Sequence, residues 1–306
     1  MEFAEALLIS IVTASTPLLL AAIGELVVER SGVLNLGVEG MMIMGAVCAF
    51  ATSLVTGSPY LGVLAGMFGG VAMALLFGFL TLMLVANQVA TGLALTLLGL
   101  GLSGMIGEHF VGTPGIKLPQ IEIPLLHDIP VIGESVFGQD ALFYVSLLLV
   151  AGTSWMLFKT RWGLILRAVG ENHNSAHALG YDVIKVRYMA VLFGGLCAGL
   201  SGAYLSLVYT SLWIENMTAG RGWIALALVV FSSWLPGRII VGAYLFGTVS
   251  ILQFHAQGAG WAVPTQFLAS LPYLATILAL VIISRNRAVA RVNTPSCLGL
   301  AFVPDR

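Results

Sequence analysis

Five polar side chains lie within or beside apolar stretches of this 306-residue chain: Asn35, Glu39, Gln88, Glu215 and Asn216. A charged group in hydrocarbon costs about 2.5 kcal/mol or more, so it normally faces the protein interior or a water-filled path. Asn35 and Glu39 belong to SGVLNLGVEG (31–40), whose glycines favour a kinked or partly unwound backbone. Such backbone is tolerated at membrane depth only when it is buried in protein or lines a cavity. We predict that the five residues line a polar path; hydrogen bonding between helices explains Asn35 and Glu39 equally well.

Two other patterns are typical of catalysis or metal binding. GLSG occurs at 101–104 and 199–202, and Ser103 or Ser201 with His255 would form the dyad of an intramembrane serine protease. A small-residue packing motif that occurs twice is the better interpretation. His173 and His177 have the i, i+4 spacing of helical metal ligands, but a solvated helix face is favoured because no HExxH glutamate or evident third ligand accompanies them. We predict no catalytic residue, no metal site and no cofactor.

The composition predicts a membrane protein. The chain is 58% hydrophobic and 9% charged, whereas a soluble domain carries about 25% charged residues. Apolar stretches of about 20 residues that contain glycine indicate helical spans rather than the strands of a barrel. A net charge of −1 argues against nucleic acid, which binds a basic face. The sequence also lacks the Walker motif GxxxxGK[ST], so it does not bind ATP by that device.

The apolar stretches predict a single all-α domain, residues 1–306, built as a polytopic bundle of about eight or nine transmembrane helices. The first 23 residues lack a basic region before their apolar stretch, which favours a retained span over a cleaved signal peptide. The stretch 223–234 is short, and the count is eight if it is a re-entrant half-helix. The predicted spans are about 6–28, 41–55, 61–85, 89–107, 141–158, 188–209, 223–234, 239–255 and 265–283.

The loops predict the orientation. Segment 159–187 holds five of the 13 lysines and arginines, and the tail 285–306 is also basic, so both are expected in the cytoplasm. The loop 109–140 contains acidic residues with Lys117 as its only lysine or arginine and is expected outside the cytoplasm. The N-terminus would then lie outside and the C-terminus inside. In the basic segment, Glu171 to Leu179 can form a short polar helix bounded by Gly170 and Gly180.

Two segments resemble each other: FGGVAMALLFGFLTL (68–82) and FGGLCAGLSGAYLSL (193–207). In the predicted topology these spans run in opposite directions, as in the inverted repeats of transporters. Chance similarity between glycine- and leucine-rich spans explains the match equally well.

Three stretches resemble the ABC-transporter permeases of the branched-chain amino acid and simple-sugar uptake group, in the branch that imports nucleosides. They are GELVVERSGVLNLGVEGMMIMGA (24–46), WGLILRAVGENHNSAHALGYDV (162–183), and GRGWIALALVVFSSWLPGRIIVGAYLFG (220–247) with the later LPYLATILALVIISR (271–285). Together they cover more than half of the chain in the family's order. Two details depart from the family pattern: His173 stands where a proline is usual, and Trp234-Leu235-Pro236-Gly237 lacks the usual asparagine before the proline.

The resemblance implies a permease subunit of an ATP-driven importer in a bacterial or archaeal cytoplasmic membrane. The substrate would be a small polar solute, a nucleoside or simple sugar. The partners would be ATP-binding cassette subunits that hydrolyse the ATP, a second related permease and an extracytoplasmic substrate-binding protein. The stretch from Arg167 to Gly180 would contain the coupling helix that docks on the ATP-binding subunit. Glu171, Asn172 and Ala176 would contact that subunit, and Gly170 and Gly180 would set the helix ends.

Two alternatives of other classes stay open from the residues alone. The chain could be an ion-coupled secondary transporter or channel in which Glu39 is the coupling acid. A more distant alternative is the intramembrane serine protease. Dependence of transport on an ATP-binding subunit separates the first alternative from the importer.

Overall fold

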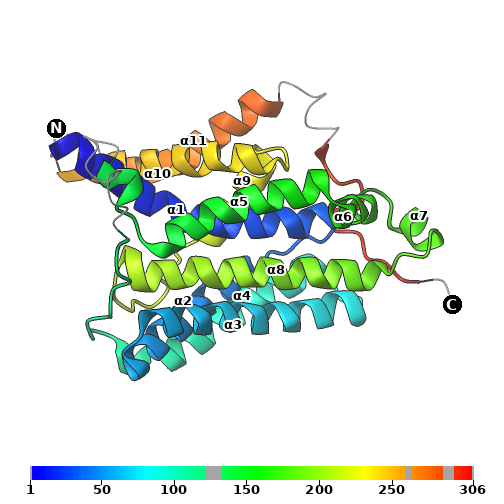
Figure 1. The fold of residues 1–306 in the computed structure, drawn as a ribbon, viewed down its shortest axis with the longest axis horizontal. Helices are drawn as coiled ribbons and strands as arrows, with labels where there is room; N and C mark the ends of the chain where they lie inside the picture. Colours follow the sequence, from blue (N-terminus) through cyan, green and yellow to red (C-terminus); the bar gives the residue numbers. More distant parts are fainter. Residues whose placement is uncertain (1, 122–132, 259–263, 285–292, 305–306) are drawn as a thin grey trace.

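The chain forms a bundle of long helices, seen in a computed structural model that describes residues 2–121, 133–258, 264–284 and 293–304 (Figure 1). Seven helical stretches among these residues are long and apolar enough to cross a membrane: Glu5–Arg30, Val38–Thr56, Pro59–Met83, Gln88–Phe110, Ala141–Lys159, Val183–Tyr209 and Pro236–Gly258. They confirm the polytopic all-α prediction. The exact number of spans and the orientation in the membrane stay predictions.

The helices follow the order of the predicted spans. They are α1 (Glu2–Arg30), α2 (Val38–Thr56), α3 (Pro59–Gly78), α4 (Gln88–Gly107), α5 (Ala141–Lys159), α6 (Arg161–Glu171), α7 (His173–Ala178), α8 (Val183–Tyr204), α9 (Arg221–Phe231), α10 (Pro236–Gly258) and α11 (Thr265–Ser284). The predicted span 223–234 corresponds to α9, which has only 11 residues and is too short to cross a bilayer by itself.

Polar residues mark where several helices begin. Ser58 caps α3 ahead of Pro59, Asn87 caps α4, and Asp140 caps α5 with its carboxylate accepting from two backbone N–H groups. These side chains satisfy N–H groups that lack a partner inside the helix. Short polar residues between apolar runs therefore fix the helix boundaries.

Glycine lets α2, α3 and α8 pack at backbone distance. A Cβ added to Gly45 would lie 2.6 Å from the Cα of Gly199, and one added to Gly70 would lie 2.7 Å from the backbone nitrogen of Gly199. Gly66 packs against Ala203, four residues further along α8. Gly66 meets Ala203, and the later residue Gly70 meets the earlier residue Gly199. The two helices therefore run antiparallel, as the inverted-repeat interpretation requires. Each also ends in a π-helical turn, η1 (Phe79–Met83) and η4 (Leu205–Tyr209). The repeat itself stays a prediction.

The segments predicted to share one side of the membrane meet at one end of the bundle. Arg30 donates to the carbonyl of Asn293 over 3.1 Å, and the backbone N–H of Cys297 donates to the carbonyl of Gly170 over 2.9 Å. At the opposite end, the loop after α4 pairs with the residues after α8 through the N–H of Leu118 and the carbonyl of Leu207, 3.1 Å apart. Figure 1 shows α6, α7 and the C-terminus together at the end opposite the N-terminus.

Candidate translocation pathway and coupling segment

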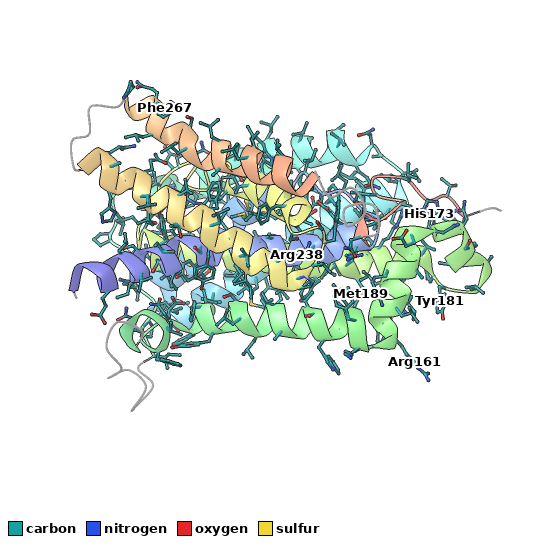
Figure 2. All side chains as sticks on the ribbon, turned by 90° about the horizontal axis from the view of Figure 1, so that it is seen from above. Arg161, His173, Tyr181, Met189, Arg238 and Phe267 are labelled. Carbon is teal, nitrogen blue, oxygen red and sulfur yellow. The ribbon has the colours of Figure 1, made fainter. Side chains whose placement is uncertain are left out.

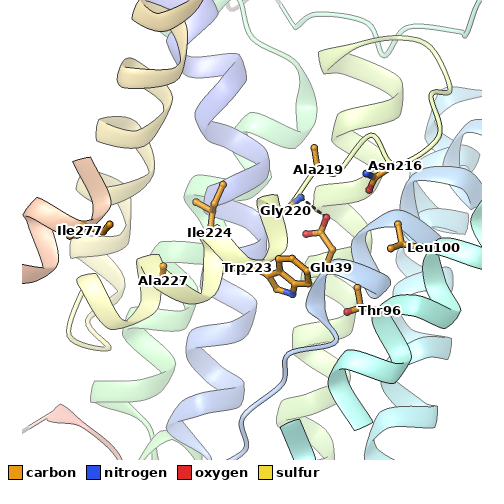
Figure 3. Close-up of a pocket in the computed structure, with 10 residues that line it drawn as sticks. All are labelled: Glu39, Thr96, Leu100, Asn216, Ala219, Gly220, Trp223, Ile224, Ala227 and Ile277. Carbon is orange, nitrogen blue, oxygen red and sulfur yellow. Dashed lines mark hydrogen bonds between the residues drawn. The ribbon is translucent and has the colours of Figure 1, made fainter. Parts of the chain in front are cut away.

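The carboxylate of Glu39, in the first turn of α2, caps the start of the short helix α9. Its Oε1 accepts from the N–H of Gly220 at 2.8 Å, and its Oε2 accepts from the N–H of Gly222 at 2.6 Å. Figure 3 shows the side chain pointing at Gly220. The first N–H groups of a helix lack internal partners and carry a partial positive charge, so an anion there is stabilised. Glu39 thus joins α2 to α9 across 183 residues of sequence.

The chain before α9 is irregular, and the helix begins after Gly220, which has no side chain that could cap it. Asn216 and Ala219 have positive φ angles of 57° and 45°, and Gly220 has a φ of 84°. Gly222 touches the backbone of Glu39, since an added Cβ would lie 2.7 Å from the Glu39 Cα. A larger residue at position 222 would therefore separate the two helices.

A cavity of about 830 Å³ opens beside this contact. Its polar lining is Glu39, Thr96 and Asn216, and the indole of Trp223 forms part of its wall. Trp223 is 47% exposed, whereas Glu39 is 2% exposed. We call this cavity the central pocket; its remaining lining residues are Leu100, Ala219, Gly220, Ile224, Ala227 and Ile277. Of the five predicted pathway residues, the pocket brings together Glu39 and Asn216.

Asn35 and Gln88 hold the unwound segment between α1 and α2. The carboxylate of Glu25 accepts from the Asn35 backbone N–H at 3.3 Å, and the Asn35 side-chain oxygen accepts from the N–H of Gly37 at 3.0 Å. The Gln88 side-chain oxygen accepts from the N–H of Leu34 at 2.8 Å. Both are buried and neither is among the pocket's lining residues. In this arrangement they supply the hydrogen bonds that a buried irregular backbone needs.

Glu215 and the GLSG serines lie outside the central pocket. The Glu215 side chain is exposed and lies near Gly104 of α4. Ser103 donates to the carbonyl of Leu100, and Ser201 donates to that of Pro17. The Ser201 bond joins α8 to α1, whereas the Ser103 bond lies within α4.

The basic segment folds as two helices with a break at Asn172. Its side chain caps α7 by accepting from the Ser175 N–H at 2.9 Å, and Gly180 follows α7 with a φ of 87°. The prediction that Gly170 begins the polar helix was wrong. Gly170 lies inside the last turn of α6, where the absence of a side chain lets it approach the Arg30 carbonyl.

Of the predicted contact residues, Glu171 and Asn172 are exposed and Ala176 is not. Ala176 is 2% exposed and packs with Val169 and Val183 in a small core, so it packs inside the chain rather than facing a partner. Arg167 lies with its guanidinium 5.2 Å from the ring centre of Phe158, a stacking contact back onto α5.

His173 occupies the first position of α7 and is buried. Its Nδ1 lies 3.1 Å from a guanidinium nitrogen of Arg187. Burial, together with the positive charge of Arg187, lowers the pKa of His173. The histidine that replaces the family's usual proline therefore connects α7 to α8.

Comparison with known proteins now decides the family. Residues 7–284 match the family described as "Branched-chain amino acid transport system / permease component". The chain belongs to this permease family. It is therefore a multi-pass protein of the cytoplasmic membrane, and the ion-coupled and protease alternatives are disfavoured.

Three relatives match this permease over nearly their whole length. It is 42% identical to the "Putative glucose ABC transporter permease protein TsgC13" of Haloferax volcanii, over 97% of each chain. It is 32% identical to the guanosine ABC transporter permease protein NupQ of Bacillus subtilis, over 95% of this chain and 94% of the relative. It is 33% identical to the nucleoside ABC transporter permease protein NupC of Lactococcus lactis, over 95% of each chain. ABC permeases work in general with ATP-binding subunits and substrate-binding proteins.

Sequence reasoning missed two arginines that organise the end of the bundle with α6 and α7, which we call the coupling end because the coupling segment is predicted there. Arg30 donates through Nε and Nη2 to the carbonyl of Trp234, and that indole N–H donates to Glu29 at 2.6 Å. Arg187 donates to the carbonyls of Ser31 and Leu300. Their partners are mostly backbone carbonyls, which every residue has, so the sequence does not identify them. The sequence could only indicate that both arginines lie at the ends of apolar spans, where a charged side chain is unusual.

Proposed function

We propose that this permease imports a neutral polar solute, a sugar or nucleoside, through the central pocket. The observation that carries the proposal is the pocket itself, which is lined by the short helix α9 and the irregular chain before it, as substrate sites are in membrane transporters. The names of the relatives, for glucose, guanosine and nucleosides, support the same substrate class.

The lining suits a neutral ring. The Trp223 indole is an exposed apolar face against which a sugar or nucleobase can stack. Thr96 offers a hydroxyl, and Asn216 offers an amide that both donates and accepts. Among the described lining residues Glu39 alone is ionisable, and its two oxygens already accept from backbone N–H groups. The pocket therefore favours hydrogen-bonding solutes without a net charge.

The coupling segment supports dependence on a separate ATP-binding subunit. Glu171 and Asn172 are exposed between α6 and α7, at the end of the molecule away from the N-terminus. A subunit docked there would move α6 and, through Gly170 and Arg30, the end of α1. ATP hydrolysis would occur on that subunit, and the permease itself would be catalytically inert. A second related permease and an extracytoplasmic binding protein would complete the importer.

Uptake by proteoliposomes that contain the whole importer tests the pocket. Trp223→Ala is expected to lower uptake of labelled guanosine or glucose about tenfold, because stacking on an aromatic contributes on the order of 1–3 kcal/mol per base. Trp155→Ala is the matched control, since Trp155 is 65% exposed and is not among the pocket's lining residues. Equal uptake by the two variants would overturn the pocket assignment. Uptake by the permease without any ATP-binding subunit would overturn the importer.

A further inference from the structure

A second cavity, of about 260 Å³, adjoins the central pocket at the start of α9. Ala219 and Ile224, both drawn in Figure 3, line the two cavities together. Glu39 lines the central pocket, whereas Arg221 lines the second cavity. The rest of its wall comes from α1, from η4 and from α10. We call this cavity the arginine pocket.

The arginine pocket lies at the depth of the candidate spans, in the half of the bundle away from α7. Two candidate spans, α1 and α10, contribute to its wall. Its lining residue Phe246 lies near the middle of α10, and Gln253 lies nearer the end of α10 that points toward the N-terminus of the chain in Figure 1. A charged side chain at such a depth is costly without a partner, so Arg221 marks a candidate functional site.

Arg221 uses one of its hydrogen-bond donors inside the protein. Its Nη1 donates to the carbonyl of Met217 at 2.9 Å, and its guanidinium carbon lies 5.1 Å from the ring centre of Tyr209. A guanidinium has five N–H donors. Within the part of the chain that the structure describes, no carboxylate pairs with Arg221, and neither the Tyr209 hydroxyl nor the Gln253 amide forms a hydrogen bond. Donors from α9, η4 and α10 therefore remain for a ligand.

The charge of the arginine pocket indicates an anionic ligand. Arg221 is the one charged side chain among its described lining residues. Ser250 adds no donor, because its hydroxyl donates to the carbonyl of Phe246 at 2.9 Å. A planar guanidinium matches the oxygens of a phosphate group, and apolar walls strengthen the attraction between opposite charges. The several oxygens of a phosphate group can accept from donors on more than one element.

One side of the arginine pocket reaches the outside of the bundle. Phe254 lines the pocket and is 53% exposed, and the nearby Leu252 is 51% exposed. Both belong to α10, which is long and apolar enough to cross a membrane. Exposed apolar side chains on such a helix can face lipid tails, so a lipid headgroup could reach Arg221 from this side.

We propose that the arginine pocket binds a phosphate group, with Arg221 as its cation and Gln253 as a second donor. The position favours the headgroup of an anionic lipid in the leaflet away from α7, and soluble phosphate has the same chemistry. A phosphate bound there would lie beside Ala219 and Ile224 and would stabilise the start of α9. The inference goes beyond the proposed function, because it does not depend on which solute is imported.

The test is the melting temperature of the purified full-length permease in detergent, titrated with dioleoylphosphatidylglycerol or with sodium phosphate. Dioleoylglycerol, which has the same tails without the phosphate, and sodium chloride at equal ionic strength are the respective controls. A ligand that binds only the folded chain raises the melting temperature. We expect Arg221→Gln to raise the half-saturating concentration about tenfold or more, since a charge-assisted bond is lost, and Gln253→Leu to raise it about threefold.

Arg238→Gln is the matched control variant. Arg238 is an exposed arginine in the first turn of α10 and is not among the lining residues of the arginine pocket. Figure 2 shows it at the end of α10 nearer His173. Its loss removes the same charge from the same helix, and we expect the half-saturating concentration to stay unchanged.

The outcomes identify the source of the phosphate or overturn the inference. A response to phosphatidylglycerol alone identifies a lipid headgroup, and a response to sodium phosphate identifies the phosphate group itself; each supports the inference when Arg221→Gln weakens it and Arg238→Gln does not. Equal weakening by the two arginine variants would show a general charge effect and overturn the inference. No response of the unchanged permease beyond the controls would also overturn it. Gln253→Leu keeps Arg221 and its contacts, so an unchanged half-saturating concentration in this variant counts against the pocket even if Arg221→Gln does not fold.

Discussion

Glu39 determines how α2 and α9 are held beside the central pocket. Glu39→Gln replaces one of its two accepting oxygens with an amide donor, which would face the N–H of Gly220 or Gly222. Leaving a buried N–H without an acceptor costs about 1–3 kcal/mol. We expect a lower melting temperature in detergent and reduced uptake. Glu215→Gln, the same change at an exposed position, is the control. Wild-type stability and uptake in Glu39→Gln would show that the cap is dispensable.

His173 predicts a pH dependence of the coupling end. Burial and the charge of Arg187 lower the pKa of His173, so the folded chain binds this proton more weakly than the unfolded chain does. The stabilising contribution is therefore present at neutral pH and lost as the pH falls below about 6.5, the ordinary histidine value. The protection of 173–178 against hydrogen exchange, relative to the intrinsic exchange rate at each pH, is expected to fall between pH 7.5 and 5.5. The same loss of protection in His173→Gln would assign it to another group.

At the scale of elements, α7 depends on its cap. Asn172→Ala removes the side chain that accepts from the Ser175 N–H, and losing such a cap costs about 0.5–2 kcal/mol. Because α7 has only six residues, we expect faster hydrogen exchange in α7 and weaker binding of the ATP-binding subunit. Asn174→Ala is a matched control, since Asn174 is an exposed asparagine within the same helix. Similar exchange in both variants would contradict the role of the cap.

The elements also show what the sequence could predict. Hydropathy located the long helices because it depends on local composition. The stretch 223–234 forms a helix of only 11 residues, and whether it is a re-entrant half-helix stays a prediction. Gly170 was misplaced because glycine serves both at helix ends and at close contacts, and sequence does not distinguish the two roles. The Glu39 cap on α9 joins residues 181 and 183 positions apart, and its partners are backbone groups. The sequence marked Glu39 as unusual and could not identify its partner.

At the scale of the whole molecule, the coupling end and the central pocket share one continuous segment. Gly32 accepts from the tail at Gly299, and Arg187 donates to the neighbouring Ser31 carbonyl. Seven residues after Gly32, Glu39 holds the start of α9. Residues 31–39 therefore connect the end that carries α6 and the tail with the pocket, and we propose that the gating displacement passes along this segment.

The charge distribution predicts the orientation of the molecule in the membrane. Lysine and arginine near span ends stay in the cytoplasm, so the end with α7 is expected inside and the residues after α4 outside. Leu179→Cys and Val111→Cys place single thiols at positions that are 77% and 63% exposed. In a variant whose cysteines Cys48, Cys197 and Cys297 are replaced by alanine, a membrane-impermeant maleimide should label Val111→Cys in intact cells and Leu179→Cys only after lysis. The reverse pattern would place the coupling end outside, where an ATP-binding subunit cannot reach it, and would overturn the proposed function together with the orientation.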